Sequence, residues 1–154
     1  MSDTIREIII QDVIARLANI RIVNGYNTDI GRNVLRARKI ISADDLPSCI
    51  VWPRSETAES KYGLTVCTMP VLIEGLVEFG DENPSVVSEK MLGDFIKNIL
   101  SPLWSRSPDY INSIAYVSGG TDEYPDEEDL TVGTSVMFNV AYTTVIGDPY
   151  SHGT

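Results

Sequence analysis

Histidine is the scarcest of the chemically useful residues in this sequence of 154 residues. The only one, His152, lies in a stretch of small and polar residues near the C-terminus. We expect this stretch to form a flexible tail from about residue 147. Catalytic triads, Cys–His pairs and His-rich zinc sites each need a positioned imidazole. The sequence therefore predicts neither histidine-based catalysis nor a zinc site of that kind.

Cysteine and long apolar runs are also scarce. Cys49 and Cys67 are the only cysteines and have no Cys-x-x-Cys spacing, which is typical of a reducing compartment, so we expect two small buried hydrophobic residues. No apolar stretch approaches the roughly 18 residues that span a bilayer. The N-terminus also lacks the pattern of a secretory signal. We expect a soluble chain with no membrane partner.

Basic residues are few, and they are unevenly distributed. Residues 1–61 contain nine basic and eight acidic residues, a net charge of +1, whereas residues 62–154 contain three basic and fourteen acidic residues, a net charge of −11. Such a surface repels nucleic acid over most of its area. The contrast suits self-association, in which a more basic patch meets an acidic one. An ordinary solvated acidic surface would give the same composition.

The segment at residues 24–39, NGYNTDIGRNVLRARK, combines a glycine-containing turn with several arginines and invites comparison with a phosphate-binding loop. Gly25 and Gly31 enclose five residues instead of four, and Arg32 and Asn33 stand where Lys and Ser or Thr are needed. A predicted helix also precedes the loop, where a strand is required. We therefore predict no nucleotide site and no cofactor.

Carboxylates are the remaining candidates for chemistry, and they cluster in the segment TDEYPDEED. This segment lacks the alternating ligands and central glycine of an EF-hand calcium loop. A solvated surface loop is one interpretation, and a metal-dependent hydrolase is a second hypothesis, although no base or nucleophile accompanies the cluster. We expect no enzyme and no bound metal. The cluster comprises Asp122, Glu123, Asp126, Glu127, Glu128 and Asp129.

Two helices are predicted from apolar residues at three- and four-residue spacing. The first begins after a capping box formed by Thr4 and Glu7 and ends between residues 19 and 24, with Arg6, Glu7, Asp12 and Arg16 largely outside its apolar face. The second follows Asn83-Pro84, a cap followed by proline. The expected core comprises Ile9, Leu17, Leu92, Phe95, Ile96, Val136, Phe138 and Val140, and the second helical stripe extends to Leu103.

Strand patterns occupy most of the remaining chain. They predict an edge strand over residues 33–40, a short buried strand over 49–52, one bent strand or two short strands over 64–79, a strand over 110–117 and an alternating strand over 134–145. Residues 54–61 are predicted to form a polar loop. The order indicates an α+β fold: a mainly antiparallel sheet with two amphipathic helices on one face, in a single domain spanning residues 1–154.

Taken in order, five segments resemble the tail terminator proteins of tailed bacteriophages, a family of minor tail or tail completion proteins. They are a first helix ending in NGYNTDIG, the strand NVLRARK, then LPSCIVW, then MPVLIEGLV before the second helix, and the closing VMFNVAYTTVIGDPYS. Each segment is short, so their order carries the resemblance, which covers nearly the whole chain. Another phage neck protein, a tail completion or head–tail joining protein, is the nearest alternative.

The resemblance implies a structural virion protein without catalytic residues. It would form a hexameric ring on the tail tube, stop tube growth and provide a docking face for the head. Its partners would be other copies of itself, the tail tube protein and the head–tail connector protein, with DNA only passing through. It would belong to the virion neck, and to the host bacterial cytoplasm during assembly. The expected subunit interface comprises Arg32, Arg36, Arg38, Tyr26 and Asp29, although the arginines would also suit a solubilising strand edge.

Overall fold

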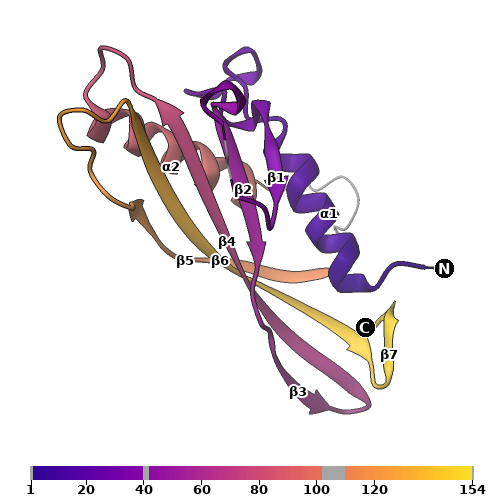
Figure 1. Cartoon of the computed structure of the whole chain (residues 1–154). Helices are drawn as coiled ribbons and strands as arrows, with labels where there is room; N and C mark the ends of the chain where they lie inside the picture. The colour runs from indigo at the N-terminus through magenta and orange to yellow at the C-terminus, as the bar shows by residue number, and fades with distance from the viewer. Residues whose placement is uncertain (1, 40–41, 102–109, 154) are drawn as a thin grey trace.

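The computed structural model describes residues 2–39, 42–101 and 110–153. Within these residues, a mixed, mostly antiparallel sheet of seven strands packs with two α-helices on one face, which confirms the predicted α+β class (Figure 1). The elements are α1 (Ile5–Leu17), β1 (Val34–Arg36), β2 (Ser48–Pro53), β3 (Thr57–Lys61), β4 (Leu64–Glu78), α2 (Pro84–Leu100), β5 (Ile111–Thr121), β6 (Thr131–Val145) and β7 (Asp148–His152), with short 3-10 turns η1 (Ile22–Asn24), η2 (Ile30–Arg32) and η3 (Ala43–Asp45).

The sheet is built on one long strand pair. Its order is β1-β2-β4-β6-β5, and β4 and β6 pair along their whole length. The β1–β2 pair is parallel, and the other pairs are antiparallel. At one end, β3 pairs with the beginning of β4 and β7 with the end of β6. We call this end, residues 57–68 and 141–152, the arm, because it extends past the ends of both helices in Figure 1.

Helix α1 begins where the sequence predicts. The hydroxyl oxygen of Thr4 accepts a hydrogen bond from the backbone N–H of Glu7 at 3.0 Å, and the helix ends at Leu17, slightly before the expected region. The prediction is wrong for Asp12 and Arg16, which are buried. Arg16 faces the end of α2, where its guanidinium donates to the carbonyl oxygens of residues 98 and 101. A polar contact between helices cannot be read from apolar spacing.

Helix α2 also begins as predicted. The Asn83 side chain accepts a hydrogen bond from the backbone N–H of Ser85 at 2.9 Å, and Pro84 is the first helical residue. The helix ends at Leu100, and Leu103, which was expected to extend its apolar stripe, lies outside the described residues. The cap and the proline therefore fix the start of the helix from local sequence alone.

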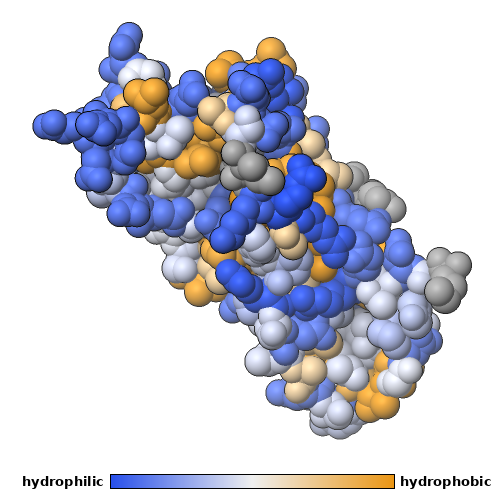
Figure 2. Space-filling model, in the orientation of Figure 1, coloured by the Kyte–Doolittle hydropathy of each residue, from blue (hydrophilic) through white to orange (hydrophobic). Residues whose placement is uncertain are grey.

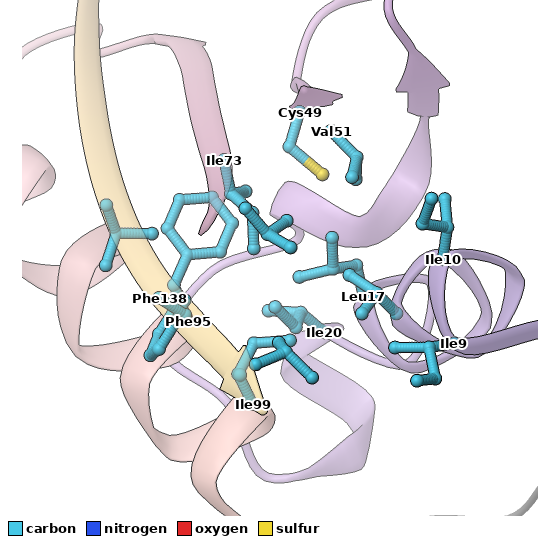
Figure 3. Close-up of a cluster of buried hydrophobic side chains, with 14 of the residues drawn as sticks. Ile9, Ile10, Leu17, Ile20, Cys49, Val51, Ile73, Phe95, Ile99 and Phe138 are labelled. Carbon is cyan, nitrogen blue, oxygen red and sulfur yellow. The ribbon is translucent and has the colours of Figure 1, made fainter. Parts of the chain in front are cut away.

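The core lies between the sheet and the helices (Figure 3). Phe95 of α2 and Phe138 of β6 are among its largest fully buried side chains. Six of the eight predicted core residues are buried, while Leu92 and Ile96 are partly buried and pack against the cluster. Both cysteines are buried and unpaired, as expected. The apolar periodicity therefore identified the inward-facing positions correctly.

Pro70 does not interrupt β4, so this region is one strand. The proline lies where the neighbour of β4 changes from β2, which ends with the pair Pro53–Val71, to β3, which begins with the pair Thr57–Thr68. The Pro70 carbonyl oxygen accepts a hydrogen bond from the Arg54 backbone N–H at 2.9 Å in the connection between those strands. An N–H at position 70 would point to the same side as this carbonyl group, away from β6. The proline therefore removes no hydrogen bond between β4 and β6.

Two predictions about the arm are wrong. The expected polar loop over residues 54–61 contains strand β3, and the expected flexible tail from about residue 147 contains strand β7. Each strand forms a hairpin with its neighbour. The first turn is Tyr62-Gly63, with φ of 52° and 77°, and the second contains Gly147 with φ of 76°. All residues of β3 are exposed, so no alternating apolar pattern marks it as a strand.

Candidate subunit interface and neighbouring sites

The segment NGYNTDIG forms a loop that α2 holds in place. The Asp94 carboxylate is 2% exposed, and it accepts hydrogen bonds from the backbone N–H of Asn27 at 3.1 Å and of Thr28 at 2.8 Å. It also accepts a hydrogen bond from the Thr28 hydroxyl at 2.6 Å. Because a buried carboxylate with three donors is well satisfied, the loop has a defined position on the helix. This contact could not be read from the sequence, because Asp94 lies within an apolar helical pattern.

Tyr26, an expected interface residue, packs against the same helix. Its hydroxyl accepts a hydrogen bond from the Asn98 side chain at 3.1 Å. The Lys97 ammonium lies 4.7 Å from the centre of its ring and donates to the carbonyl oxygen of Gly25 at 3.0 Å. Tyr26 is therefore engaged within its own chain and fixes the turn.

Asp29, a second expected interface residue, also has partners within the chain. Its carboxylate accepts a hydrogen bond from the backbone N–H of Ile22 at 2.8 Å and lies 3.5 Å from the Arg21 guanidinium. These contacts close the loop between η1 and η2. The carboxylate is half-exposed, so its contribution to stability is small.

The three expected interface arginines do not form one row. Strand β1 contains only Arg36 of the three, Arg32 belongs to η2, and Ala37, with a φ of 48°, ends the strand before Arg38. The Arg36 guanidinium donates two hydrogen bonds to the Glu7 carboxylate of α1, at 2.6 and 2.7 Å. These bonds lower the pKa of Glu7. Arg36 is thus engaged by Glu7 within its own chain, and its place in a subunit interface stays a prediction.

Arg32 and Arg38 are exposed and, within the described part of the chain, make no ion pair. Lys39 shares both properties. We call these three residues the basic edge, because they flank β1, the outermost strand on one side of the sheet. Among the described residues, the cationic groups of the expected interface that make no ion pair are Arg32 and Arg38.

The acidic loop at residues 122–129 connects β5, the outermost strand on the other side, to β6. Its six carboxylate residues are exposed, and among the described residues their carboxylate groups accept a hydrogen bond from the Ser135 hydroxyl to Asp122 and one from the Asp126 N–H to Asp129 at 2.9 Å. In the described ranges, no three His, Cys, Asp or Glu residues are grouped so as to hold a metal ion. Figure 2 shows a hydrophilic surface where this loop lies, at the upper left.

A cluster that the sequence did not predict lies beside the arm. The Glu56 carboxylate accepts hydrogen bonds from Arg6 at 2.7 Å and from the Tyr142 hydroxyl, and it lines a cavity of about 320 Å³ together with Cys67. Burial raises the pKa of Cys67 and of Tyr142. Burial also opposes ionisation of Glu56, but the hydrogen bonds from Tyr142 and Arg6 outweigh it and lower its pKa.

The chemistry of this cluster is that of a structural contact. At neutral pH the thiol and the phenol keep their protons, and the carboxylate is ionised and already bound by donors. None of the three is therefore an activated nucleophile or a general base. The four residues are separated by at least eleven positions in the sequence, and no short motif could have revealed them.

Comparisons with known proteins supply no family: no family model matches the chain, and no curated protein matches it. In the ranges that the structure covers, no helix has the length and apolar character needed to cross a membrane. The geometry and charge of the two sheet edges, together with the resemblance drawn from the sequence, are the basis for assigning a function.

Proposed function

We propose that this chain is a structural protein of a phage tail, which assembles as a ring on the end of the tail tube, stops its polymerisation and provides the face that joins the head. The observation that carries the proposal is the placement of unpaired charge: Arg32 and Arg38 flank β1, and the acidic loop follows β5, the outermost strands on the two sides of one sheet, while Lys39 and Asp122 line one pocket on the sheet between them. The resemblance of five ordered segments to tail terminator proteins supports the same assignment.

A ring requires a heterologous interface, in which two different patches of the same chain fit each other. The basic edge of one copy and the acidic loop of the next are such a pair, because their charges are opposite and neither is neutralised by ion pairs within the described part of its own chain. A single exposed ion pair contributes only about 0 to 1 kcal/mol. A closed ring repeats the contact at every subunit boundary, which multiplies this contribution.

The overall charge also suits the proposed place in the virion. A net charge of −10 repels the phosphate backbone. DNA must pass through a neck ring without binding to it, and an acidic chain meets that requirement. The partners would be the tail tube protein on one side and the head–tail connector protein on the other.

The direct test is negative-stain microscopy of the protein alone and mixed with tail tubes of the phage that encodes it. We expect rings at the tube ends, and tubes that no longer elongate when tube protein is added. Rings that bind tubes without stopping elongation would instead indicate a head–tail joining or tail completion protein. Absence of any binding to tubes would refute the proposal.

A charge-reversal pair tests the interface. We expect Arg38→Glu to weaken capping while the circular dichroism spectrum stays unchanged, because Arg38 is exposed and unpaired among the described residues. Arg54→Glu is the matched control, since Arg54 is also exposed and unpaired but lies outside the basic edge. Arg36 is avoided, because its reversal would place a carboxylate against Glu7. Equal capping by both variants would remove the basic edge from the interface.

A further inference from the structure

The tip of the arm presents a tyrosine that the fold does not use. Tyr62 is 93% exposed and has a φ of 52°. Two-residue hairpin turns with positive φ at both positions favour Asn, Asp or Gly, because an aromatic side chain is strained there. Gly63 is well suited to its position, with a φ of 77°. Tyr62 therefore costs free energy in its own chain and makes no buried contact in return.

The neighbouring turn makes the arm tip apolar. Val145 and Ile146 are 40% and 49% exposed, and the backbone N–H of Ile146 donates to the carbonyl oxygen of Gly63 at 3.2 Å, which joins the two turns. Figure 2 shows hydrophobic surface at the lower right, where the β6–β7 turn lies in Figure 1. A contiguous exposed apolar patch is typical of an interaction site.

A pocket of about 300 Å³ lies on the sheet away from the arm tip, and Trp52 is one of the residues that line it. The Trp52 indole nitrogen is buried and has no hydrogen-bond partner among the described residues. Because that nitrogen is itself covered, the pocket offers the apolar ring of Trp52 rather than its N–H. The other lining residues are Lys39, Ile50, Glu74, Gly75, Leu76, Asp122 and Gly133.

We infer that Tyr62 of one copy inserts into the Trp52 pocket of the next copy in the ring, an inference that rests on the proposed function. The tyrosine ring would pack against the ring of Trp52, with Ile50 and Leu76 beside it. Lys61, which is exposed and makes no ion pair among the described residues, adjoins Tyr62. It would face Glu74 and Asp122, whose two negative charges exceed the single positive charge of Lys39 at the pocket.

The geometry requires two copies. Gly63 precedes β4, and Gly75 at the pocket lies twelve residues further along the same extended strand. At about 3.3 Å per residue, the tip and pocket are about 40 Å apart. A continuous paired strand cannot fold back on itself, so a tip cannot fill its own pocket. Where the contact is not reciprocated between the two copies, it is heterologous and repeats into a ring or a filament.

Cysteine cross-linking tests this contact in assembled protein. Tyr62→Cys and Leu76→Cys variants are mixed, assembled on tail tubes and oxidised gently, and Cys49 and Cys67 stay unreactive because both are buried. We expect a linked dimer that contains one chain of each variant, and none from either variant alone. Rings without the mixed dimer would overturn this inference and leave the ring function standing.

A substitution suited to the turn separates folding from docking. Tyr62→Asn fits the positive φ, so the variant should fold at least as well as the wild type. We expect it to reduce capping at least about tenfold, as loss of a central aromatic anchor does. Tyr150→Asn removes another exposed tyrosine of the arm, 51% exposed, and should cap normally. Normal capping by Tyr62→Asn would overturn the inference.

If the wild type forms no rings, the proposed function fails. Formation of the mixed dimer in concentrated free protein then tests the contact between Tyr62 and the Trp52 pocket independently of that function.

Discussion

The two parts of the long sheet differ in how they bury their side chains. Beneath the helices, Phe95 and Phe138 are 0% and 1% exposed and close an apolar core. In the arm, Tyr62 is 93% exposed, all residues of β3 are exposed, and the contacts include hairpin pairing and the polar cluster around Glu56. The core residues are explained by folding alone. Folding alone does not explain the exposed arm residues, which is the ground for placing a partner there.

The largest effect is expected in the core. Phe95→Ala should lower the free energy of unfolding by about 3 to 5 kcal/mol, because it leaves a cavity between α2 and the sheet. Urea denaturation followed by circular dichroism measures the change. Val86→Ala on the same helix is the control, since Val86 is 50% exposed and its loss should cost about 0.5 kcal/mol or less. Equal midpoints for both variants would contradict the position of α2.

The next effect is expected where α2 holds the NGYNTDIG loop. Asp94→Ala would leave the backbone N–H groups of Asn27 and Thr28 without their acceptor, and we expect a loss of about 2 to 3 kcal/mol. Amide hydrogen exchange at those two residues should accelerate more than exchange in β6. Asp81→Ala is the control for the loss of one negative charge, because Asp81 is exposed. Unchanged exchange at residues 27 and 28 would show that the loop does not depend on Asp94.

A smaller, pH-dependent effect is expected at the base of the arm. Because the pKa of Glu56 is lowered in the folded chain, its stabilisation is present above the ordinary glutamate pKa of about 4.3 and is lost as pH falls through the folded value. Glu56→Gln should therefore reduce the acid dependence of stability and cost about 1 to 2 kcal/mol at pH 7.

Thermal unfolding between pH 3 and pH 7 measures this difference. The control is Glu59→Gln, a change at an exposed carboxylate on the neighbouring strand β3. Parallel pH profiles for the Glu56 variant and the wild type would show that the cluster does not contribute to acid sensitivity.

The smallest effect on folding is expected at the arm tip. Tyr62→Asn should change the free energy of unfolding by no more than about 0.5 kcal/mol, because the side chain is exposed and asparagine tolerates positive φ. Together with Phe95→Ala, this variant compares an aromatic residue that stabilises the fold with one that does not. A loss above about 2 kcal/mol in urea denaturation would show that Tyr62 stabilises its own chain, and the two parts of the sheet would then be alike.

Local pattern predicted the elements that carry an apolar face. The caps at Thr4 and Asn83 and the alternation of β6 marked both helices and the central strand, because each signal lies within a few neighbouring residues. Strands β3 and β7 were missed. Exposed strands form through pairing with a neighbour, and their own residues carry no alternation that reveals the partner.

The candidate site was predicted only in part. The sequence by itself determined that Arg32 and Arg38 follow a turn near a sheet edge, and that acidic residues gather in one later loop. Only the tertiary structure decided that Arg36 is bound to Glu7, 29 residues away, and that Glu56 meets Tyr142, 86 residues away. Charge clusters and apolar periodicity are properties of neighbouring residues and can be read from the sequence. The partner of a side chain depends on how distant segments pack, and no local pattern specifies that packing.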